Sequence, residues 1–385
     1  MNNRKKKICV VVASRANYGR IKSVLREIKN HDNLELQLIV AASALLHRFG
    51  NVIEGIRNDG FEISRTAYLI VEGENPTTMA KSTGLAIIEL ATLFEDLKPD
   101  IVLTIADRFE NMATAIASSY MNIHLAHTQG GEQTGSIDES VRHAITKLAH
   151  LHFPATDKSR DILIQMGEDP STIFMVGCPS IDIIANIDFT LGDLFIRYGG
   201  VGHGINPAEP YLVVLQHPVT TEYGSGLHQI RETLDAINQI GIQTIWFWPN
   251  VDAGSDDISK GLRIFREQNP KRRIHFYRNF SPEDYARLIN NCACLIGNSS
   301  SAIREGSFLG VPAVNIGTRQ NRRERGPNII DVWYDAREIV KAIKKQLDHG
   351  KYKRSLLYGD GKSGERIVKI LDGELPPLQK HLYLQ

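Results

Sequence analysis

The sequence predicts an α/β protein with two Rossmann-like, doubly wound domains that face a central cleft. Short apolar runs alternate with helical segments along nearly the whole chain, and such alternation produces parallel sheets covered by helices on both faces. Distinctive polar clusters follow the apolar runs directly. The length of 385 residues exceeds one ordinary hydrophobic core, so two domains of similar size are expected.

The first half of the chain begins with a β-rich apolar run and then alternates. Strands are expected at residues 7–13, 34–41, 101–105, 123–126 and 173–176, and helices at 18–29, 77–97 and 136–151. The helix 77–97 is stopped by the proline at position 99, because proline cannot continue a helix. Residues on one face of the helix 136–151 are apolar at helical spacing, namely Ile137, Val141, Ala144, Ile145 and Leu148.

The second half resumes the alternation after a less regular, glycine-rich stretch at residues 187–210. Its strands are expected at residues 211–215, 244–247, 275–277, 294–296 and 313–316. This pattern predicts an N-terminal domain at 1–186, a C-terminal domain at 187–372 and a tail at 373–385.

Composition narrows the classes of partner. A hydrophobic content of 42%, a charged content of 23% and a net charge of +1 are typical of a globular protein and argue against a nucleic-acid or membrane surface. No apolar segment approaches the roughly 20 residues that span a bilayer. The chain start lacks the apolar core of a signal peptide, so a cytoplasmic location is expected.

Neither a metal nor a redox cofactor is indicated by the motifs. The four cysteines are scattered without metal-ligand spacing, and no His-x-x-x-His or Cys-x-x-Cys pattern occurs. The first strand is not followed by the glycine-rich dinucleotide fingerprint, so NAD is not expected.

The most informative segment is residues 297–305, GNSSSAIRE, where a small-residue loop opens a short helix. Backbone N–H groups at such a helix start favour an anion. Glu305 lies about one turn further on, where a carboxylate can accept hydrogen bonds from a vicinal diol such as a ribose. Together they point to a nucleotide, preferably a diphosphate. The alternative is an ordinary strand–turn–helix in which a serine caps the helix.

Similar polar clusters end the other strands. Ligands of open α/β sheets bind at the carboxyl ends of the strands, so these clusters are expected to converge on one cleft. They are residues 14–19 (SRANYG), 106–108 (ADR), 127–132 (HTQGGE), 177–179 (GCP), 216–220 (QHPVT), 249–252 (PNVD), 297–299 (GNS) and 317–319 (GTR).

The chemistry of these clusters differs between the halves. The second half offers neutral and cationic partners for a diphosphate, namely His217, Asn250, Ser299, Ser300 and Arg319. The first half offers acids, with basic residues nearby: Asp107, Glu132 and Asp138, beside Arg15, Arg142 and His143. Carboxylates opposite a diphosphate suit acid–base work on a sugar carbon beside the leaving group. Alternatively, Asp138 caps a helix or supplies negative charge in its first turn, and Asp107 forms a structural ion pair with Arg108.

Four long runs carry a resemblance to a known family: residues 136–150 (SIDESVRHAITKLAH), 215–221 (LQHPVTT), 249–255 (PNVDAGS) and 297–320. The chain resembles the hydrolysing UDP-N-acetylglucosamine 2-epimerases, including the epimerase half of the bifunctional sialic acid enzyme of animals. The resemblance spans roughly residues 7–371. Residues 130–132 (GGE) and the following Asp138 favour the hydrolysing branch over its non-hydrolysing relatives.

The resemblance implies a glycosyltransferase-B-like pair of domains, assembled as a homodimer or homotetramer, with no metal or cofactor. It implies a nucleotide sugar as ligand and a reaction in which UDP leaves carbon 1 while the proton on carbon 2 is removed. Water then adds to the resulting glycal with inversion at carbon 2, which releases UDP and N-acetylmannosamine, as in bacterial sialic and legionaminic acid pathways.

The resemblance also implies roles for individual residues. On the acid–base side, Asp107 and Asp138 match family positions, and Glu132, Gln129, Arg108 and His143 accompany them. On the nucleotide side, the matching residues are His217, Asn250, Ser299, Ser300, Glu305 and Arg319, and Arg15 reaches them from the other domain. Asp252, Phe280 and Asn298 are further candidates for nucleotide binding.

Two departures from the family pattern concern the sugar side. Many members have Glu where this chain has Gln129, and an amide cannot exchange a proton near neutral pH. Either Glu132 takes over that role, or Gln129 only orients sugar or water. Ala44 replaces a frequent His. These changes suggest an altered sugar, a 2,4-diacetamido-trideoxy hexose. The competing functions are a glycosyltransferase of the same architecture and a non-catalytic sugar-nucleotide sensor.

Overall fold

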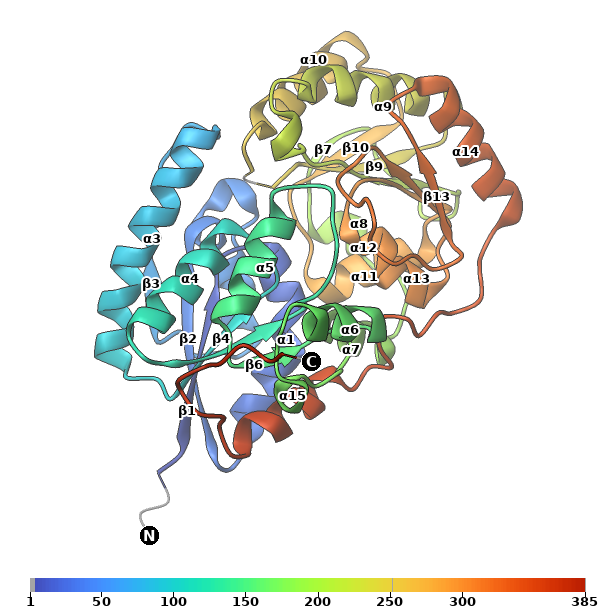
Figure 1. Cartoon of the computed structure of the whole chain (residues 1–385). Helices are drawn as coiled ribbons and strands as arrows, with labels where there is room; N and C mark the ends of the chain where they lie inside the picture. The colour runs from blue at the N-terminus through green and yellow to red at the C-terminus, as the bar shows by residue number, and fades with distance from the viewer. Residues whose placement is uncertain (1–3, 251, 385) are drawn as a thin grey trace.

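Two parallel sheets, one in each half of the chain, organise the computed structural model, which describes residues 4–250 and 252–384 (Figure 1). The N-terminal domain lies at the lower left of the view and the C-terminal domain at the upper right. Helices cover both faces of each sheet. The predicted fold class, two Rossmann-like domains facing each other, is confirmed.

The N-terminal sheet has the strand order β3-β2-β1-β4-β5-β6, and all of its pairs are parallel. Its strands are β1 (Lys6–Val12), β2 (Leu34–Ala41), β3 (Arg65–Ala67), β4 (Ile101–Ile105), β5 (His124–Thr128) and β6 (Leu151–Phe153). The helices of this half are α1 (Arg15–Asn30), α2 (Val52–Asn58), α3 (Pro76–Leu97), α4 (Phe109–Tyr120), α5 (Asp138–Leu148), α6 (Asp157–Gln165) and α7 (Pro179–Ala185), with 3-10 turns η1 (Ala42–Leu45), η2 (His47–Phe49) and η3 (Pro170–Thr172).

The C-terminal sheet has the order β13-β12-β11-β8-β9-β10-β7, and only the short edge strand β7 pairs in the antiparallel sense among the described strands. Its strands are β7 (Val201–Gly202), β8 (Leu212–Leu215), β9 (Thr244–Phe247), β10 (Ile274–Tyr277), β11 (Cys294–Gly297), β12 (Ala313–Ile316) and β13 (Ile329–Val332). The helices are α8 (Leu194–Arg197), α9 (Gly226–Ile240), α10 (Ser255–Gln268), α11 (Pro282–Asn291), α12 (Ser300–Ile303), α13 (Glu305–Leu309), α14 (Ala336–His349) and α15 (Ser363–Asp372), with the turn η4 (Thr220–Glu222).

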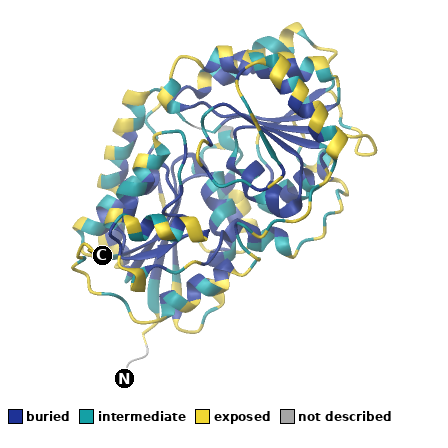
Figure 2. Cartoon of the chain, turned by 45° about the vertical axis from the view of Figure 1, so that its right-hand side comes forward, coloured by how far each residue is buried: buried dark blue, intermediate teal, exposed yellow. Residues whose placement is uncertain are grey.

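Each central strand is buried on both faces, which explains its continuous apolar run. Along β1, Ile8 and Val10 face one hydrophobic core while Cys9 and Val11 face another, because successive side chains of a strand point to opposite sides. Strand β8 alternates in the same way. Figure 2 shows the strands buried and the outer faces of the helices exposed.

Most predicted strands are present within one or two residues, but the last strand of the N-terminal domain was predicted in the wrong place. Residues 173–176 make only an isolated bridge, from Ile173 to His152. The sixth strand is β6, which begins at Leu151, the last residue of the predicted helix 136–151. That helix ends at Leu148, since Ala149 adopts an extended conformation. A strand of three residues is too short to show periodicity.

The predicted end of the C-terminal domain at residue 372 does not follow the packing. Helix α15 packs on α1, and its Ile367 and Leu371 belong to a hydrophobic core of the N-terminal domain. The chain therefore returns to its first domain, as the red segment beside β1 in Figure 1 shows. Helical periodicity predicts that α15 has an apolar face but not which sheet that face covers.

The segment after α15, predicted as a tail, lies against the N-terminal domain. His124 Nε2 lies 2.8 Å from the carbonyl oxygen of Pro376 and His150 Nε2 lies 3.0 Å from that of Leu378. Lys380 Nζ donates to the carbonyl oxygens of Thr146, Lys147 and Ala149 at the end of α5, at 2.7–3.1 Å. This segment is thus part of the domain's packing.

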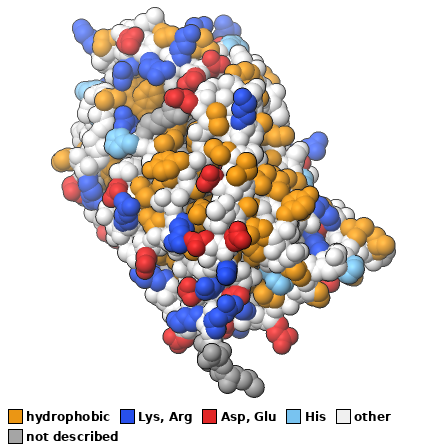
Figure 3. Space-filling model, turned by 90° about the vertical axis from the view of Figure 1, so that its left-hand side faces the viewer, with side chains coloured by type: hydrophobic (Ala, Val, Ile, Leu, Met, Phe, Trp, Pro, Cys, Tyr) orange, Lys and Arg blue, Asp and Glu red, His pale blue; other side chains and the backbone are white. Residues whose placement is uncertain are grey.

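The helices on the outer side of the N-terminal sheet carry apolar residues on the surface. Ile88 of α3 and Tyr120 at the end of α4 are exposed, as is Tyr68. Figure 3 looks onto the side where α3 lies and shows hydrophobic side chains across its centre. Among the described residues, no helix combines the length and the apolar character needed to cross a membrane.

Candidate active site

A cavity of about 1130 Å³ lies between the domains, at the carboxyl ends of both sheets. This volume suits a ligand of nucleotide-sugar size. Seven of the predicted nucleotide-site residues line the cavity: Arg15, His217, Asn250, Phe280, Ser299, Ser300 and Glu305. The predicted acid–base residues do not line it. They lie beside it, in a buried charged cluster that begins at Arg20, a lining residue 4.0 Å from Asp107.

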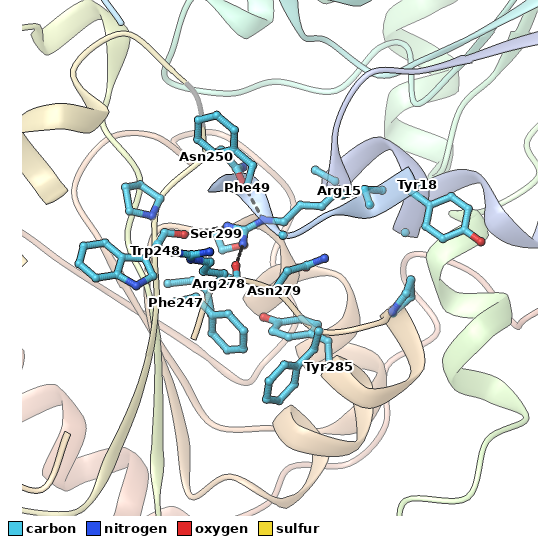
Figure 4. Close-up of a pocket in the computed structure, with 18 of the residues that line it drawn as sticks. Arg15, Tyr18, Phe49, Phe247, Trp248, Asn250, Arg278, Asn279, Tyr285 and Ser299 are labelled. Atoms are coloured by element: carbon cyan, nitrogen blue, oxygen red, sulfur yellow. Dashed lines mark hydrogen bonds between the residues drawn. The ribbon is translucent and has the colours of Figure 1, made fainter. Parts of the chain in front are cut away.

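Arg15 spans the two domains (Figure 4). Ser14 caps α1, so Arg15 is the first helical residue after β1 and projects from the sheet edge. Its Nε donates to Asn250 Oδ1 at 2.8 Å, and its Nη2 donates to the carbonyl oxygen of Trp248 at 2.9 Å. Burial lowers the pKa of Arg15 to about 10, which leaves it cationic at neutral pH. Arg15 thus contacts the C-terminal domain across the cleft.

His217 is held as a neutral hydrogen-bond donor. Its Nδ1 accepts from the backbone N–H of Asn250 at 3.3 Å, which leaves the proton on Nε2. Burial and the charges of Arg319, Arg15 and Arg108 hold its pKa well below the usual value. Asn298 does not line the cavity. Its side chain clamps the backbone N–H and C=O of His217 at 2.8 Å each, so it positions His217.

The serine segment after β11 forms a donor-rich wall. Ser299 caps α12, and Ser300 Oγ accepts from Arg20 Nη2 at 2.6 Å. Helix α12 has only four residues, so its dipole is small, and individual N–H, hydroxyl and guanidinium donors carry the anion-binding capacity here. Glu305 lines the cavity, and its Oε2 is buried without a hydrogen-bond partner among the described residues, as expected of an acceptor for a ligand diol.

Phe280 and Arg319 complete the nucleotide side. Phe280 is buried in the cavity wall, where its ring stacks on Tyr198 with centroids 4.1 Å apart. Arg319 Nη1 donates to the carbonyl oxygen of Asn298 at 3.2 Å, and its Nη2 lies 3.8 Å from Asp138 Oδ2 of the other domain. Arg319 therefore links the two sides of the site.

Asp107 is a carboxylate surrounded by guanidinium groups. Arg142 donates to its Oδ2, Arg323 lies 3.9 Å from the same oxygen, and Arg20 lies 4.0 Å from its Oδ1. Burial by itself would raise the pKa of Asp107, but the three positive charges outweigh it and hold the pKa below the ordinary value. Asp107 is thus ionised throughout the neutral range. Its predicted ion pair with Arg108 is not formed.

The pKa of Asp138 is shifted in the opposite direction, above its ordinary value. It is the first residue of α5 and not its cap, a position that Ile137 occupies. Burial and then the negative charge of Asp107 raise the pKa of Asp138, and Arg319 offsets this only in part. Two neighbouring carboxyl groups whose environments push their pKa values apart are a recurring mark of acid–base sites.

Glu132 is buried between arginines. Its Oε2 accepts from Arg304 Nη2 and lies 3.2 Å from Arg323 Nη2. Burial raises the pKa of Glu132, but the charges of Arg304, Arg323 and Arg142 prevail and lower it. The chain turns sharply just before Glu132: Gly131 has φ +77°, and a Cβ there would lie 2.1 Å from the carbonyl oxygen of Ser159.

Arg108 and Asp252, predicted for catalysis and nucleotide binding, instead join the domains. Arg108 Nη1 lies 2.8 Å from Asp252 Oδ1, and its Nε and Nη2 each lie 3.2 Å from Glu110. Burial lowers the pKa of Arg108, but the carboxylates of Asp252 and Glu110 outweigh it and raise the pKa. Neither Arg108 nor Asp252 lines the cavity.

Gln129 and His143, the remaining acid–base candidates, also lie off the cavity wall. Gln129 is fully buried with φ +62°, and its Nε2 donates to Cys178 Sγ at 3.6 Å. His143 lies on α5, 3.8 Å from Glu139. Burial and then the charge of Arg142 lower the pKa of His143. Ala44 packs in the core, while His47 of the same loop lines the cavity.

The arginines Arg20, Arg304 and Arg323 were not predicted as part of the site. Each is far in sequence from the acid it approaches, and a single arginine normally indicates a solvated surface. Arg304 carried the clearest signal, since it lies within the serine motif between two short apolar stretches. Among the described residues, no group of three or more His, Cys, Asp or Glu side chains is arranged to hold a metal ion.

Comparison with known proteins assigns the family. The family model described as UDP-N-acetylglucosamine 2-epimerase matches residues 26–372, and the chain belongs to this family. It is 36% identical to the UDP-N,N'-diacetylbacillosamine 2-epimerase (hydrolyzing) of Legionella pneumophila, over 95% of both chains. It is 32% identical to the GDP/UDP-N,N'-diacetylbacillosamine 2-epimerase (hydrolyzing) of Campylobacter jejuni, over 85% of this chain and 84% of that one.

Solved structures support the fold. The UDP-GlcNAc 2-epimerase of Neisseria meningitidis bound to UDP-GlcNAc superposes with a TM-score of 0.76 at 16% identity, over 95% of this chain and 99% of that one. The enzyme of Methanocaldococcus jannaschii in complex with UDP-GlcNAc and UDP gives 0.77 at 18% identity, with the same coverage. The glycosyltransferase-B-like arrangement of domains is thus confirmed.

Proposed function

We propose that this protein is a hydrolysing sugar-nucleotide 2-epimerase, which converts a UDP-linked 2-acetamido sugar and water into UDP and the free 2-epimer. The observation that carries the proposal is the juxtaposition of a donor-rich cavity with three carboxyl groups whose environments shift their pKa values in opposite directions. Asp107 and Glu132 have lowered pKa values, and Asp138 has a raised one. The hydrolysing relatives from Legionella and Campylobacter support the same branch.

The reaction divides into an elimination and a hydration. In the elimination, a carboxylate takes the proton from carbon 2, the carbon 1–oxygen bond breaks, and UDP leaves with the bonding electron pair. In the hydration, the oxygen of water bonds to carbon 1 of the glycal and gives up a proton to a carboxylate, while a carboxylic acid on the opposite face delivers its proton to carbon 2. We assign one of the two proton transfers at carbon 2 to Asp138, because it alone of the three carboxyl groups has a raised pKa. The transfer on the opposite face requires a second carboxyl group.

The other acids and the cavity walls have complementary roles. Asp107 remains ionised, raises the pKa of Asp138 and stabilises positive charge that develops on the sugar ring. His217 and the serine segment donate hydrogen bonds to the phosphates, and Glu305 accepts from the ribose diol. Closure of the two domains excludes bulk water from the reactive glycal.

For the sugar we propose a 2,4-diacetamido-trideoxy hexose in preference to N-acetylglucosamine. Gln129 and Ala44, which suggested this from the sequence, are fully buried, and neither lines the cavity. The support comes from the relatives from Legionella and Campylobacter, both named for N,N'-diacetylbacillosamine.

Proton NMR in deuterated water tests the function. UDP and a free 2-epimer that carries deuterium at carbon 2 are expected, with faster turnover of UDP-N,N'-diacetylbacillosamine than of UDP-N-acetylglucosamine. Efficient turnover of UDP-N-acetylglucosamine alone contradicts the proposed sugar. Product that forms only with an added acceptor indicates a glycosyltransferase, and tight UDP binding without UDP release from either sugar indicates a sensor.

We further propose a homodimer or homotetramer. The exposed apolar residues Ile88 and Tyr120 lie on adjacent helices, α3 and α4, and support association through this side of the N-terminal domain. Sedimentation of the wild type and of Ile88→Glu tests it: a single monomeric species for the wild type contradicts the proposal.

A further inference from the structure

A charged cluster joins the domains beside the cavity, and nucleotide binding does not explain it. Glu132 belongs to the N-terminal domain and is 4% exposed. Its Oε2 accepts from Arg304 and lies 3.2 Å from Arg323, and both arginines belong to the C-terminal domain. Only Arg142, whose Nη1 donates to the backbone oxygen of Glu132 at 2.7 Å, comes from its own domain.

Arg323 also connects this acid to a second one. The Nη2 atom that lies 3.2 Å from Glu132 Oε2 lies 3.9 Å from Asp107 Oδ2. Arg323 is 5% exposed, so solvent screens these interactions little. One guanidinium group of the C-terminal domain thus lies between two carboxylates of the N-terminal domain.

The position of Arg304 links the cluster to the nucleotide side of the cavity. Arg304 is the junction between α12 and α13, directly before Glu305 and four residues after Ser300. Ser300 and Glu305 line the cavity, whereas the Arg304 guanidinium lies over the ring of Tyr358, 5.0 Å from its centroid. A ligand that orders Ser300 and Glu305 therefore orders Arg304 as well.

The energetics make the cluster sensitive to domain closure. A buried carboxylate without a cationic partner is strongly disfavoured, and removal of one partner from a buried ion pair is destabilising. If the domains separate, Glu132 loses both Arg304 and Arg323 and retains Arg142. The titratable and charged groups that face Glu132 are Arg142, Lys158, Arg304, Arg322, Arg323, Glu324 and Tyr358, with Asp107 beyond Arg323.

Glu132 has one oxygen left for a ligand. Its Oε1 is buried and has no hydrogen-bond partner among the described residues. A carboxylate fixed through Oε2 and the backbone, with Oε1 unpaired, retains one acceptor for a water molecule or for another group that reaches it beside the cavity.

We propose that Arg304 and Arg323 are positioning residues that hold Glu132 ionised and aligned only when the two domains close around the nucleotide. Glu132 then participates in the acid–base chemistry only in the closed cleft, and the glycal cannot form while the site is open to water. The activity part of this inference rests on the proposed epimerase function, whereas the effect on Glu132 itself does not.

The variants Arg304→Met, Arg304→Lys and Arg354→Met test the inference. Arg354 is an exposed arginine of the same domain whose guanidinium lies 4.4 Å from the ring centroid of Phe308, so it controls for loss of a stacked guanidinium. For Arg304→Met we expect kcat to fall about 100-fold, the loss typical of a misplaced catalytic group. The UDP dissociation constant should change less than about threefold, and the acid limb of the kcat–pH profile should move up by about one unit or more.

The other variants make the test specific. Arg304→Lys should recover part of kcat, since an ammonium group supplies the charge without the fork geometry. Arg354→Met should match the wild type. The inference is overturned if the acid limb does not move in Arg304→Met, or if the loss of kcat is matched by an equal loss of UDP affinity. If Arg304→Met does not fold, Arg323→Lys and Arg323→Met are measured in the same way and against the same criteria.

A second measurement does not depend on turnover. The carboxyl carbon-13 signal of Glu132, assigned by its absence in Glu132→Gln, is followed against pH in the UDP-bound protein. We expect it to titrate at higher pH in Arg304→Met than in the wild type, and equal titration in the two overturns the inference. If the Glu132 signal titrates at higher pH in Arg304→Met than in the wild type, but the wild type does not release UDP from a nucleotide sugar, the proposed function is refuted and the inference is retained.

Discussion

Gly135 provides a direct test of the closed arrangement. It lies in the loop between β5 and α5 that carries Glu132, and its N–H donates to the carbonyl oxygen of Arg319 in the other domain at 3.1 Å. A Cβ at this position would lie 1.9 Å from the carbonyl oxygen of Thr318. Gly135→Ala therefore places a methyl group where the two domains meet, while it leaves both hydrophobic cores unchanged.

The structure sets the size of the effect. An ordinary contact begins at 3.4 Å, so the two backbones must separate by about 1.5 Å to admit the methyl group. A displacement of about 1 Å in a catalytic constellation lowers the rate about 100-fold. We expect kcat of Gly135→Ala to fall by at least about that factor. The melting temperature should change little, because the strain is relieved by domain opening.

The assay is release of UDP under saturating nucleotide sugar, with small-angle scattering of the UDP-bound protein to report the domain arrangement. Gly84→Ala is the matched control. Gly84 lies on the exposed face of α3 with no atom within 4 Å of an added Cβ, so this change should preserve kcat and slightly stabilise the helix. A Gly135→Ala protein with wild-type kcat and wild-type scattering would show that the closed contact is irrelevant to turnover.

Three further predictions follow from the charged groups. Asp107→Asn should lower turnover by at least about 100-fold, with unchanged UDP affinity by calorimetry. It should also lower the pKa of Asp138 in a carboxyl NMR titration, because a neighbouring negative charge is removed. A normal rate would exclude Asp107 from the mechanism. Arg319→Ala should mainly weaken UDP binding, and unchanged affinity would contradict its assignment. Lys380→Met should lower the free energy of unfolding in urea by about 2–3 kcal/mol, since Lys380 pairs with the buried Glu168 and caps α5. An unchanged unfolding midpoint would contradict this stabilising role of Lys380.

Much of the fold could be predicted because strands of parallel sheets are continuous apolar runs. The residues of β2, β4, β9 and β12 were predicted with the bounds that the structure has. The strands β3, β6, β7 and β13 were not predicted, because runs of two to four residues that are partly exposed or contain a buried histidine show no clear pattern. The return of α15 was not predictable for another reason: which sheet an amphipathic helix covers depends on the path of the chain between domains.

The residues of the candidate site likewise divide into those that the sequence predicted and those that it did not. Residues that follow strands directly, such as Arg15 and His217, were predicted to line the cleft and do so. Asn298 follows a strand too, but its amide is used to hold the backbone of His217, and strand-end position alone cannot separate a ligand contact from a support. The partners of the acids were missed, because ion pairs such as Glu132–Arg304 join residues far apart in the sequence.

The electrostatics of the acids depend on contact between the domains. Of the guanidinium groups that lower the pKa of Asp107, Arg323 comes from the C-terminal domain, as does Arg319, which limits the rise in the pKa of Asp138. Separation of the domains removes both charges, which raises the pKa of each carboxyl group, and admits water, which relieves burial and lowers the pKa of each. The pKa values of both carboxyl groups therefore depend on contact between the domains. Because acid–base catalysis needs one group ionised and another able to carry a proton, the chemistry and the exclusion of water are set by the same movement.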